Sequence, residues 1–200
     1  MPVTRRLLLA APALLAFAPA HAQPADPRMA ERSLGASDAK VVVTEWFSLT
    51  CTHCAAFQKE TFGQVRAKLI DTGRVRYVWR DFPLDQVALT AAMVARALPP
   101  ERYEPFITAL LASQDRWAFA RGVNSTEELA KFAVLAGLSR ASFDKTVADT
   151  ELKQAILAAQ DEGEKKFGVS STPTFVMNGK PTSGAVSYDD FAKAVDAATS

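Results

Sequence analysis

Four consecutive residues, Cys51-Thr52-His53-Cys54, hold both cysteines of the 200-residue chain. His53 is one of two histidines, and the other, His21, lies in an apolar N-terminal stretch. Disulfide exchange needs a thiolate, an accessible sulfur and a nearby second thiol that resolves the mixed disulfide. Two residues between cysteines let both sulfurs meet across the first turn of a helix. The spacing therefore predicts a redox pair in which Cys51 reacts and Cys54 resolves.

Other uses of two close cysteines are weaker or stay open. A disulfide that closes so short a loop would stabilise the fold by only about 2 kcal/mol, which makes it a poor structural staple. Structural zinc usually has four ligands, and the one-residue spacing of His53 does not aim its ring at a metal shared with the cysteines. We therefore expect no metal site. Transient Cu(I) binding by the two thiolates stays open, although the chain has no tract rich in methionine or histidine.

The two residues between the cysteines can tune the sulfur. As an imidazolium or an N–H donor, His53 would stabilise Cys51 as an anion. Lowering a thiol pKa from about 8.5 to the low end seen in such motifs is worth about 7 kcal/mol, and it makes the disulfide a stronger oxidant. A solvent-facing His53 without an electronic role is the alternative. Thr52 keeps a backbone N–H and a hydroxyl that can bond a sulfur.

Residues 1–22 have the features of a cleaved signal peptide. Two arginines precede an apolar stretch, residues 7–18, which is too short to span a membrane, and Ala20-His21-Ala22 forms an A-x-A cleavage site. Thr4-Arg5-Arg6 faintly resembles a twin-arginine signal, so the export route stays open, and a short membrane anchor is the alternative. We expect a mature chain from Gln23 in an oxidising compartment, a bacterial periplasm, where a disulfide persists.

Composition excludes some classes of partner. A chain of 200 residues with 48% hydrophobic and 22% charged residues is one globular domain, or one domain with an insertion. The formal net charge is +1, and the loss of two arginines with residues 1–22 makes it −1. No basic surplus favours nucleic acid or an anionic membrane as the main partner.

The cysteine motif lies between two predicted strands. Residues 23–34 are rich in proline and alanine and are expected to form a flexible leader. Residues 40–47 are β-branched and aromatic, which predicts a buried strand. A helix is expected over 52–70, followed by a strand over 74–80 with one wet face, and Pro83 ends this unit.

The rest of the chain predicts helices and then a hairpin. Residues 84–166 contain five helical segments, expected at 85–98, 101–113, 125–137, 139–148 and 150–166. The N-caps expected for four of them are Asp85, Ser125, Ser139 and Thr150. Thr174 to Met177 is a short strand, and Asn178-Gly179 is the strongest short hairpin signal. A last helix is expected after Ser187. The order is strand, helix, strand, helices, two strands and a helix.

Two motifs on either side of the helical segment resemble DsbA-type thiol:disulfide oxidoreductases of the thioredoxin superfamily. The run from Glu45 to Cys54 is similar to the active-site strand and helix of that family, and the run from Phe167 to Gly179 is similar to its cis-proline segment. The resemblance covers about residues 35–197. It implies an α/β thioredoxin fold with an all-helical insertion between the βαβ and ββα halves. The boundaries expected are 35–83 and 167–200 for the thioredoxin-like domain and 84–166 for the insertion.

The resemblance also implies roles for residues outside the cysteine motif. Pro173 is expected to follow a cis peptide bond and to face Cys51, although trans is the commoner form of such bonds. Thr172 is expected to pair with the backbone of a substrate. An acid such as Glu45 assists proton movement at the second cysteine in this family; an ion pair with Lys59 is the alternative for this buried carboxylate. Thr52 departs from the family, which has proline there, so the oxidising strength stays open.

The function implied is the introduction of disulfide bonds into reduced exported proteins. Reoxidation would come from a DsbB-like membrane quinone reductase, the redox-active disulfide would be the only prosthetic element, and the short leader favours a monomer. A reductase or isomerase of the same fold is the first alternative. A non-enzymatic copper-handling protein is the second.

Overall fold

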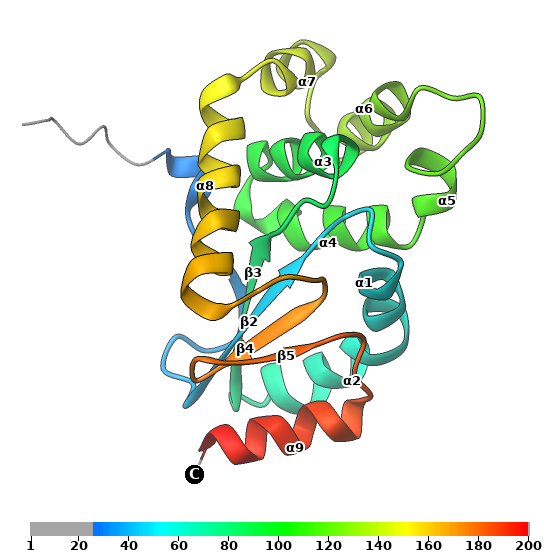
Figure 1. Cartoon of the computed structure of the whole chain (residues 1–200). Helices are drawn as coiled ribbons and strands as arrows, with labels where there is room; N and C mark the ends of the chain where they lie inside the picture. Colours follow the sequence, from blue (N-terminus) through cyan, green and yellow to red (C-terminus); the bar gives the residue numbers. More distant parts are fainter. Residues whose placement is uncertain (1–25, 200) are drawn as a thin grey trace, which may run out of the picture.

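A mixed five-stranded sheet with the order β1-β3-β2-β4-β5 forms the centre of the molecule (Figure 1). The computed structural model describes residues 26–199, so the predicted signal peptide, residues 1–22, lies outside the described residues. β2 and β3 are parallel, and the other neighbouring strands are antiparallel. The strands are β1 (Arg32–Leu34), β2 (Val41–Phe47), β3 (Val75–Asp81), β4 (Thr174–Met177) and β5 (Lys180–Ser183).

Helices fill the predicted insertion between β3 and β4, which confirms the predicted thioredoxin fold with an all-helical insertion. The helices are α1 (Thr52–Phe57), α2 (Gly63–Val65), α3 (Gln86–Ala97), α4 (Pro100–Leu111), α5 (Gln114–Trp117), α6 (Ser125–Leu135), α7 (Arg140–Val147), α8 (Thr150–Phe167) and α9 (Tyr188–Thr199). Two π-helical segments, η2 (Gln58–Phe62) and η3 (Arg66–Ile70), lie within the helix predicted over 52–70. No helix of the described residues is long and apolar enough to cross a membrane.

Side-chain caps begin four helices of the insertion, α3, α6, α7 and α8, and two of these caps lie one residue earlier than predicted. The Asp85 carboxylate accepts a backbone N–H at the start of α3, as predicted. Asn124 rather than Ser125 caps α6, and Asp149 rather than Thr150 caps α8. Each of these two side chains accepts two backbone N–H groups, and asparagine and aspartate are among the strongest N-cap residues. The predicted helices are therefore present, with small shifts at their starts.

The described part of the predicted leader, residues 26–34, contains a short helical turn and the strand β1. β1 pairs antiparallel with β3 at one edge of the sheet. Arg32 is buried, and its guanidinium carbon lies 5.5 Å from the centre of the Tyr103 ring. Its Nη2 also donates to the backbone carbonyls of Arg96 and Leu98. These contacts join distant parts of the chain, which is why the composition of the segment alone does not predict them.

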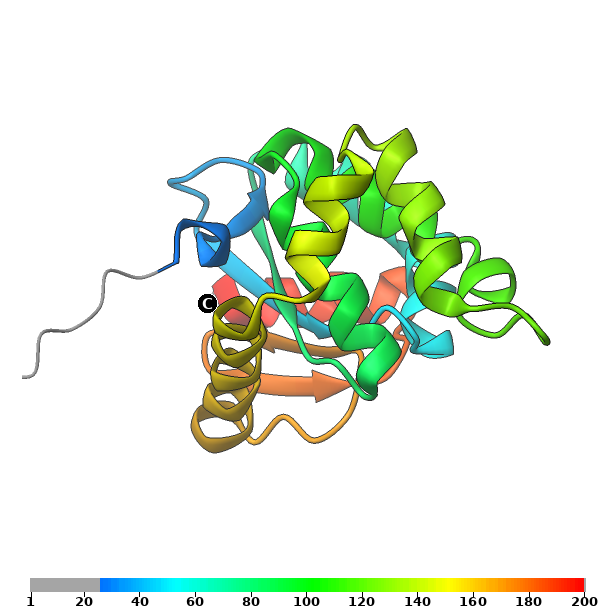
Figure 2. The ribbon, with the colours of Figure 1, turned by 90° about the horizontal axis from the view of Figure 1, so that it is seen from above.

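Helices cover both faces of the sheet (Figures 1 and 2). On one face, α9 and the helix that begins with α1 enclose a cluster of aromatic rings, which are Phe57, Phe62, Tyr77, Trp79, Phe175 and Phe191. On the other face, α8 packs on β2, where a Cβ on Gly163 would lie only 2.8 Å from the Trp46 ring. Glycine therefore allows this close approach. Helices α3 to α7 lie beyond the carboxyl ends of β2 and β3 (Figure 1), and α4 contacts α1.

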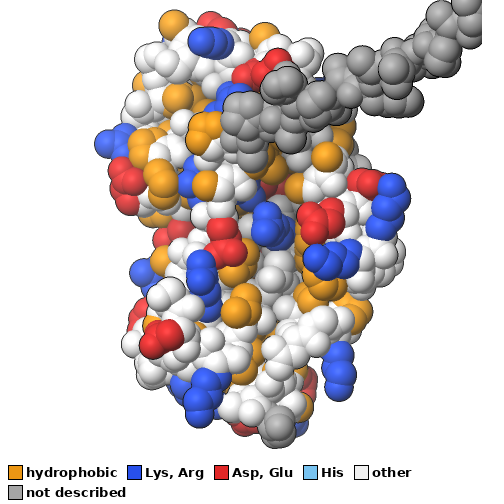
Figure 3. Space-filling view, turned by 90° about the vertical axis from the view of Figure 1, so that its left-hand side faces the viewer, with side chains coloured by type: hydrophobic (Ala, Val, Ile, Leu, Met, Phe, Trp, Pro, Cys, Tyr) orange, Lys and Arg blue, Asp and Glu red, His pale blue; other side chains and the backbone are white. Residues whose placement is uncertain are grey.

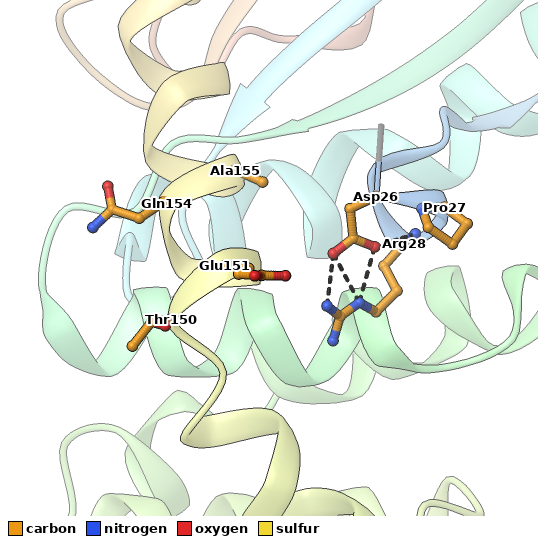
Figure 4. Close-up of a pocket in the computed structure, with 7 residues that line it drawn as sticks. All are labelled: Asp26, Pro27, Arg28, Thr150, Glu151, Gln154 and Ala155. Atoms are coloured by element: carbon orange, nitrogen blue, oxygen red, sulfur yellow. Dashed lines mark hydrogen bonds and ion pairs between the residues drawn. The ribbon is translucent and has the colours of Figure 1, made fainter. Parts of the chain in front are cut away.

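A short turn, η1 (Pro27–Met29), is fixed to the start of α8 on the side away from α1. Arg28 forms ion pairs with Asp26 at 2.6 Å and with Asp149 at 2.8 Å. Asp26 and Arg28 also border an open hollow of about 770 Å³, drawn in Figure 4, and no cysteine lines it. Basic and acidic side chains are interspersed over this side of the molecule (Figure 3), in keeping with the small net charge.

Candidate active site

Cys51 ends the loop between β2 and α1 and occupies the N-cap position of α1. Its Sγ accepts a hydrogen bond from the Cys54 backbone N–H at 3.4 Å, and as a thiol it donates to the Thr172 carbonyl at 3.2 Å. Both cysteines are in the free thiol form. Cys51 is 6% exposed and Cys54 is 1% exposed. Cys51 is therefore the more accessible of the two, and Cys54 is shielded behind it.

The two thiols differ strongly in acidity. The pKa of Cys51 is lowered from an ordinary 9.0 to about 5, mainly by a hydrogen bond from the Cys54 side chain and against the effect of burial. The Thr172 side chain and the backbone N–H groups of Cys54 and His53 lower it further. Burial raises the pKa of Cys54 far above its ordinary value, and its hydrogen bond to Cys51 and the charge of Glu45 add to this. Near neutral pH the reduced pair therefore holds one thiolate and one thiol.

The Thr172–Pro173 segment lies against Cys51. The peptide bond between Thr172 and Pro173 is cis, as predicted. Thr172 is buried, and its Oγ1 has no hydrogen-bond partner in the part of the chain that the structure describes. A Cys51 thiolate cannot donate to the Thr172 carbonyl, so the Thr172 hydroxyl becomes a further donor to it, beside the Cys54 donors. The pairing of Thr172 with a substrate backbone stays a prediction.

Thr52 and His53 lie in the first turn of α1, and both are exposed. His53 lowers the pKa of Cys51 through its backbone N–H. The electronic role expected of its imidazole stays a prediction, as does the effect of Thr52 on oxidising strength.

Glu45 is a buried carboxyl on β2, beneath the cysteines, and Tyr77 on β3 is its partner. Tyr77 Oη donates to Glu45 Oε2 at 2.8 Å. Burial raises the pKa of Glu45 from 4.5 to about 7, while the hydrogen bond from Tyr77 opposes this rise. Lys59 is exposed and forms no ion pair with Glu45 among the described residues, so that alternative is wrong. A carboxyl that titrates near neutral pH can both give and take a proton near Cys54.

Removing the Tyr77 hydroxyl tests how the pKa of Glu45 is set. We expect Tyr77→Phe to raise the pKa of Glu45 by about 1, because a hydrogen bond to a carboxylate stabilises its charged form. Carbon-13 NMR of the Glu45 carboxyl across a pH titration measures this directly. Tyr103→Phe is the matched control, since Tyr103 is equally buried but donates to Asp81 instead. An unchanged Glu45 titration in Tyr77→Phe would show that the hydrogen bond does not set its acidity.

Hydroxyl groups tie the loop before Cys51 to the start of α3. Thr50 Oγ1 donates to Asp85 Oδ2 at 2.7 Å and lies 3.3 Å from Ser48 Oγ. Ser48 Oγ also accepts the Leu84 backbone N–H. The sequence predicts Asp85 only as a helix cap and does not single out Thr50 or Tyr77. Serine, threonine and tyrosine are too common beside strands and loops to signal such contacts without the register of the sheet.

The fold and the site define a thioredoxin-fold protein with a C-x-x-C pair at the start of its first long helix. A family model described as thioredoxin matches residues 28–197. The chain belongs to the thioredoxin family, and it is similar to DsbA proteins and to protein-disulfide oxidoreductases. This confirms the thioredoxin superfamily that the two motifs predict.

Individual relatives agree with this placement. A protein of Rickettsia bellii named as a protein-disulfide oxidoreductase is 30% identical over 166 residues, which make up 82% of this chain and 63% of that protein. The crystal structure of Wolbachia pipientis alpha-DsbA1 has a TM-score of 0.77 and 28% identity, and the match covers 86% of this chain and 92% of that one. A thioredoxin-like oxidoreductase from Silicibacter pomeroyi has a TM-score of 0.69 and 27% identity, covering 86% and 93%.

Proposed function

We propose that this protein introduces disulfide bonds into reduced exported proteins by dithiol–disulfide exchange at Cys51 and Cys54. The observation that carries this proposal is the lowered pKa of Cys51 beside the raised pKa of Cys54. A thiolate that is stable at neutral pH favours the reduced pair, so the corresponding disulfide is a strong oxidant. Similarity to a DsbA protein and to protein-disulfide oxidoreductases supports the same chemistry.

The reaction starts from the Cys51–Cys54 disulfide. A substrate thiolate attacks Cys51 Sγ, forms a mixed disulfide and displaces Cys54 as a thiolate. Because the pKa of Cys54 is far above neutral, this thiolate takes up a proton, and Glu45 is the nearby group that titrates in the right range. A second substrate thiolate then attacks the substrate sulfur and releases Cys51.

Release of Cys51 is favourable because a thiol of pKa about 5 is a good leaving group. Two substrate thiols have then become one disulfide, and two electrons have passed to the cysteine pair. No bound cofactor is required for this exchange. The Thr172 and Pro173 backbone lies beside the attacked sulfur, where an extended substrate chain would align.

The setting of the reaction belongs to the same proposal. We place the protein in the periplasm, on the strength of the signal-peptide features in residues 1–22. We also propose that it acts as a monomer. The reduced pair would return its electrons to a DsbB-like membrane protein. The resemblance to DsbA proteins supports this partner, because an oxidant of substrate thiols needs an acceptor of its own.

Disulfide transfer to a reduced two-cysteine peptide tests the proposed direction. The oxidised protein is mixed with the peptide without oxygen, and the peptide disulfide is followed by mass spectrometry. We expect stoichiometric oxidation of the peptide with reduction of Cys51 and Cys54. Reduction of an oxidised peptide by the dithiol protein, with no transfer in the forward direction, would identify a reductase instead.

A metal-handling role predicts that the reduced protein binds Cu(I) and transfers no disulfide. Between Asp26 and Thr199, no three or more side chains of the His, Cys, Asp and Glu types gather in a group that could hold a metal ion. Copper would therefore depend on the two thiols. A tight Cu(I) complex in a protein that transfers no disulfide would overturn the oxidoreductase proposal in favour of metal handling.

A further inference from the structure

Gln114 connects the helical insertion to the backbone that carries the reactive sulfur. It is the first residue of α5 and is only 7% exposed. Its Nε2 donates to the Leu49 carbonyl at 2.9 Å and to the Cys51 carbonyl at 3.0 Å. A side-chain amide nitrogen has two N–H donors, so both are used on the active-site loop.

The donor is held in place by its own surroundings. The neighbouring Trp117 is fully buried, and its Nε1 donates to the Leu110 carbonyl of α4 at 2.8 Å. The backbone carbonyl of Gln114 accepts two backbone N–H groups at the end of α5, at 2.9 Å each. The amide therefore reaches the active-site loop from a fixed part of the insertion.

The Cys51 carbonyl is the point from which α1 starts. It also accepts the Ala55 backbone N–H at 3.1 Å, which is the first hydrogen bond of the helix. Fixing this carbonyl fixes the peptide plane that leads into the first turn, and the N–H groups of His53 and Cys54 in that turn stabilise the Cys51 thiolate. These N–H groups therefore lie in the turn whose first carbonyl the Gln114 amide holds.

A second link from the insertion reaches the residue between the two carbonyls. Thr50 Oγ1 donates to Asp85 at the start of α3. Leu49, Thr50 and Cys51 are therefore each hydrogen-bonded to a side chain of the insertion or its first cap. The insertion therefore fixes the active-site loop by hydrogen bonds at three successive residues.

We propose that Gln114 is a positioning residue through which the helical insertion sets the reactivity of Cys51. The inference deepens the proposed function and rests on it, since it concerns the same sulfur. Gln114 touches no reacting atom; it acts by holding the carbonyl of the residue that does.

Gln114→Met tests this, because methionine keeps the length and volume of the side chain but removes both donors. The expected result is a rise of about one pH unit in the midpoint of Cys51 thiolate formation, followed by ultraviolet absorbance, which is a roughly tenfold weaker acid. Disulfide transfer to the two-cysteine peptide should slow to a similar degree. Gln114→Asn, whose amide is too short to reach both carbonyls, should give the same shift, and it provides the test if Gln114→Met does not fold.

Gln58→Met is the matched control. Gln58 also joins the cysteine helix to the insertion, through Nε2 to Thr108 Oγ1 at 3.0 Å, but it does not touch the active-site loop. A loss of stability shared by both variants, with a thiolate midpoint moved only by Gln114→Met, supports the positioning role. Equal midpoints in Gln114→Met and the parent protein, or an equal shift in Gln58→Met, would overturn it. The titration does not depend on disulfide transfer. Its result therefore tests the role of Gln114 even if the protein proves not to transfer disulfides.

Discussion

Replacing Cys51 with alanine is expected to abolish disulfide transfer, while Cys54→Ser should leave a reactive protein that traps its partner as a mixed disulfide. Cys51 supplies the sulfur that the substrate attacks, and no other thiol is exposed in its place. Without the Cys54 thiol, a mixed disulfide on Cys51 has no resolving partner. Mass spectrometry after incubation with an oxidised peptide would detect the trapped species.

The rate at which the remaining thiol of Cys54→Ser is alkylated gives this prediction a magnitude. Near pH 6, a thiol of pKa about 5 is almost fully ionised, some 300-fold more than an ordinary thiol of pKa about 8.5. Its lower nucleophilicity offsets roughly 40-fold of this advantage, so we expect Cys51 to react about tenfold faster than an ordinary cysteine. Serine is chosen because its hydroxyl can replace the Cys54 donor, whereas in Cys54→Ala the midpoint of Cys51 thiolate formation, followed by the pH dependence of alkylation, should lie at higher pH.

Trapping by Cys51→Ala, or full transfer activity in that variant, would contradict the assignment of the attacked sulfur. Equal midpoints of the pH dependence of alkylation in Cys54→Ser and Cys54→Ala would show that the Cys54 donor does not lower the pKa of Cys51. The trapping experiment tests the first point, and the alkylation experiment tests the second.

Arg96→Met is expected to be the most destabilising single change outside the cysteines, at about 3–5 kcal/mol of unfolding free energy. Arg96 on α3 pairs with Asp81 at the end of β3, Nε to Oδ2 at 2.6 Å, and the two side chains are 1% and 3% exposed. Arg96 also donates to the Ala30 carbonyl, next to β1. Methionine would leave a buried carboxylate with only the long 3.4 Å hydrogen bond from Tyr103.

Urea unfolding of the reduced protein measures this loss, and an exposed ion pair supplies the control. Arg140 pairs with Glu127 at 2.7 Å, but both side chains are about half exposed, so Arg140→Met should leave the unfolding midpoint unchanged. A double variant, Asp81→Leu with Arg96→Met, should recover part of the stability because no charge is then left buried. Similar midpoints for Arg96→Met and Arg140→Met would show that the buried pair does not hold the insertion to the sheet.

The reactive centre is largely predictable from local sequence. Cys51, Cys54 and the Thr172–Pro173 segment lie in short motifs whose chemistry depends on neighbours in the chain, and the structure brings the two motifs together across the sheet. The helices of the insertion also follow from local signals, because capping side chains act within one turn.

The parts that the sequence does not predict all depend on long-range packing. β1 forms by pairing with the edge of β3, and no feature of residues 32–34 predicts that pairing. Tyr77 and Gln114 contact the site only because of strand register and the position of the insertion. Tyr77 is the partner of Glu45, in place of the ion pair with Lys59 that was the alternative. A hydroxyl can donate a hydrogen bond to a buried carboxyl without burying a second charge.

The reduction potential of the Cys51–Cys54 pair tests most directly the claim that this site is built to donate disulfides. It is measured by equilibrating the protein with glutathione buffers of known potential and counting free thiols. A potential closer to the value of about −120 mV of a strongly oxidising DsbA than to the value of about −270 mV of thioredoxin is the expected result. A value near that of thioredoxin would contradict it, because a Cys51 thiolate of pKa about 5 should stabilise the reduced pair.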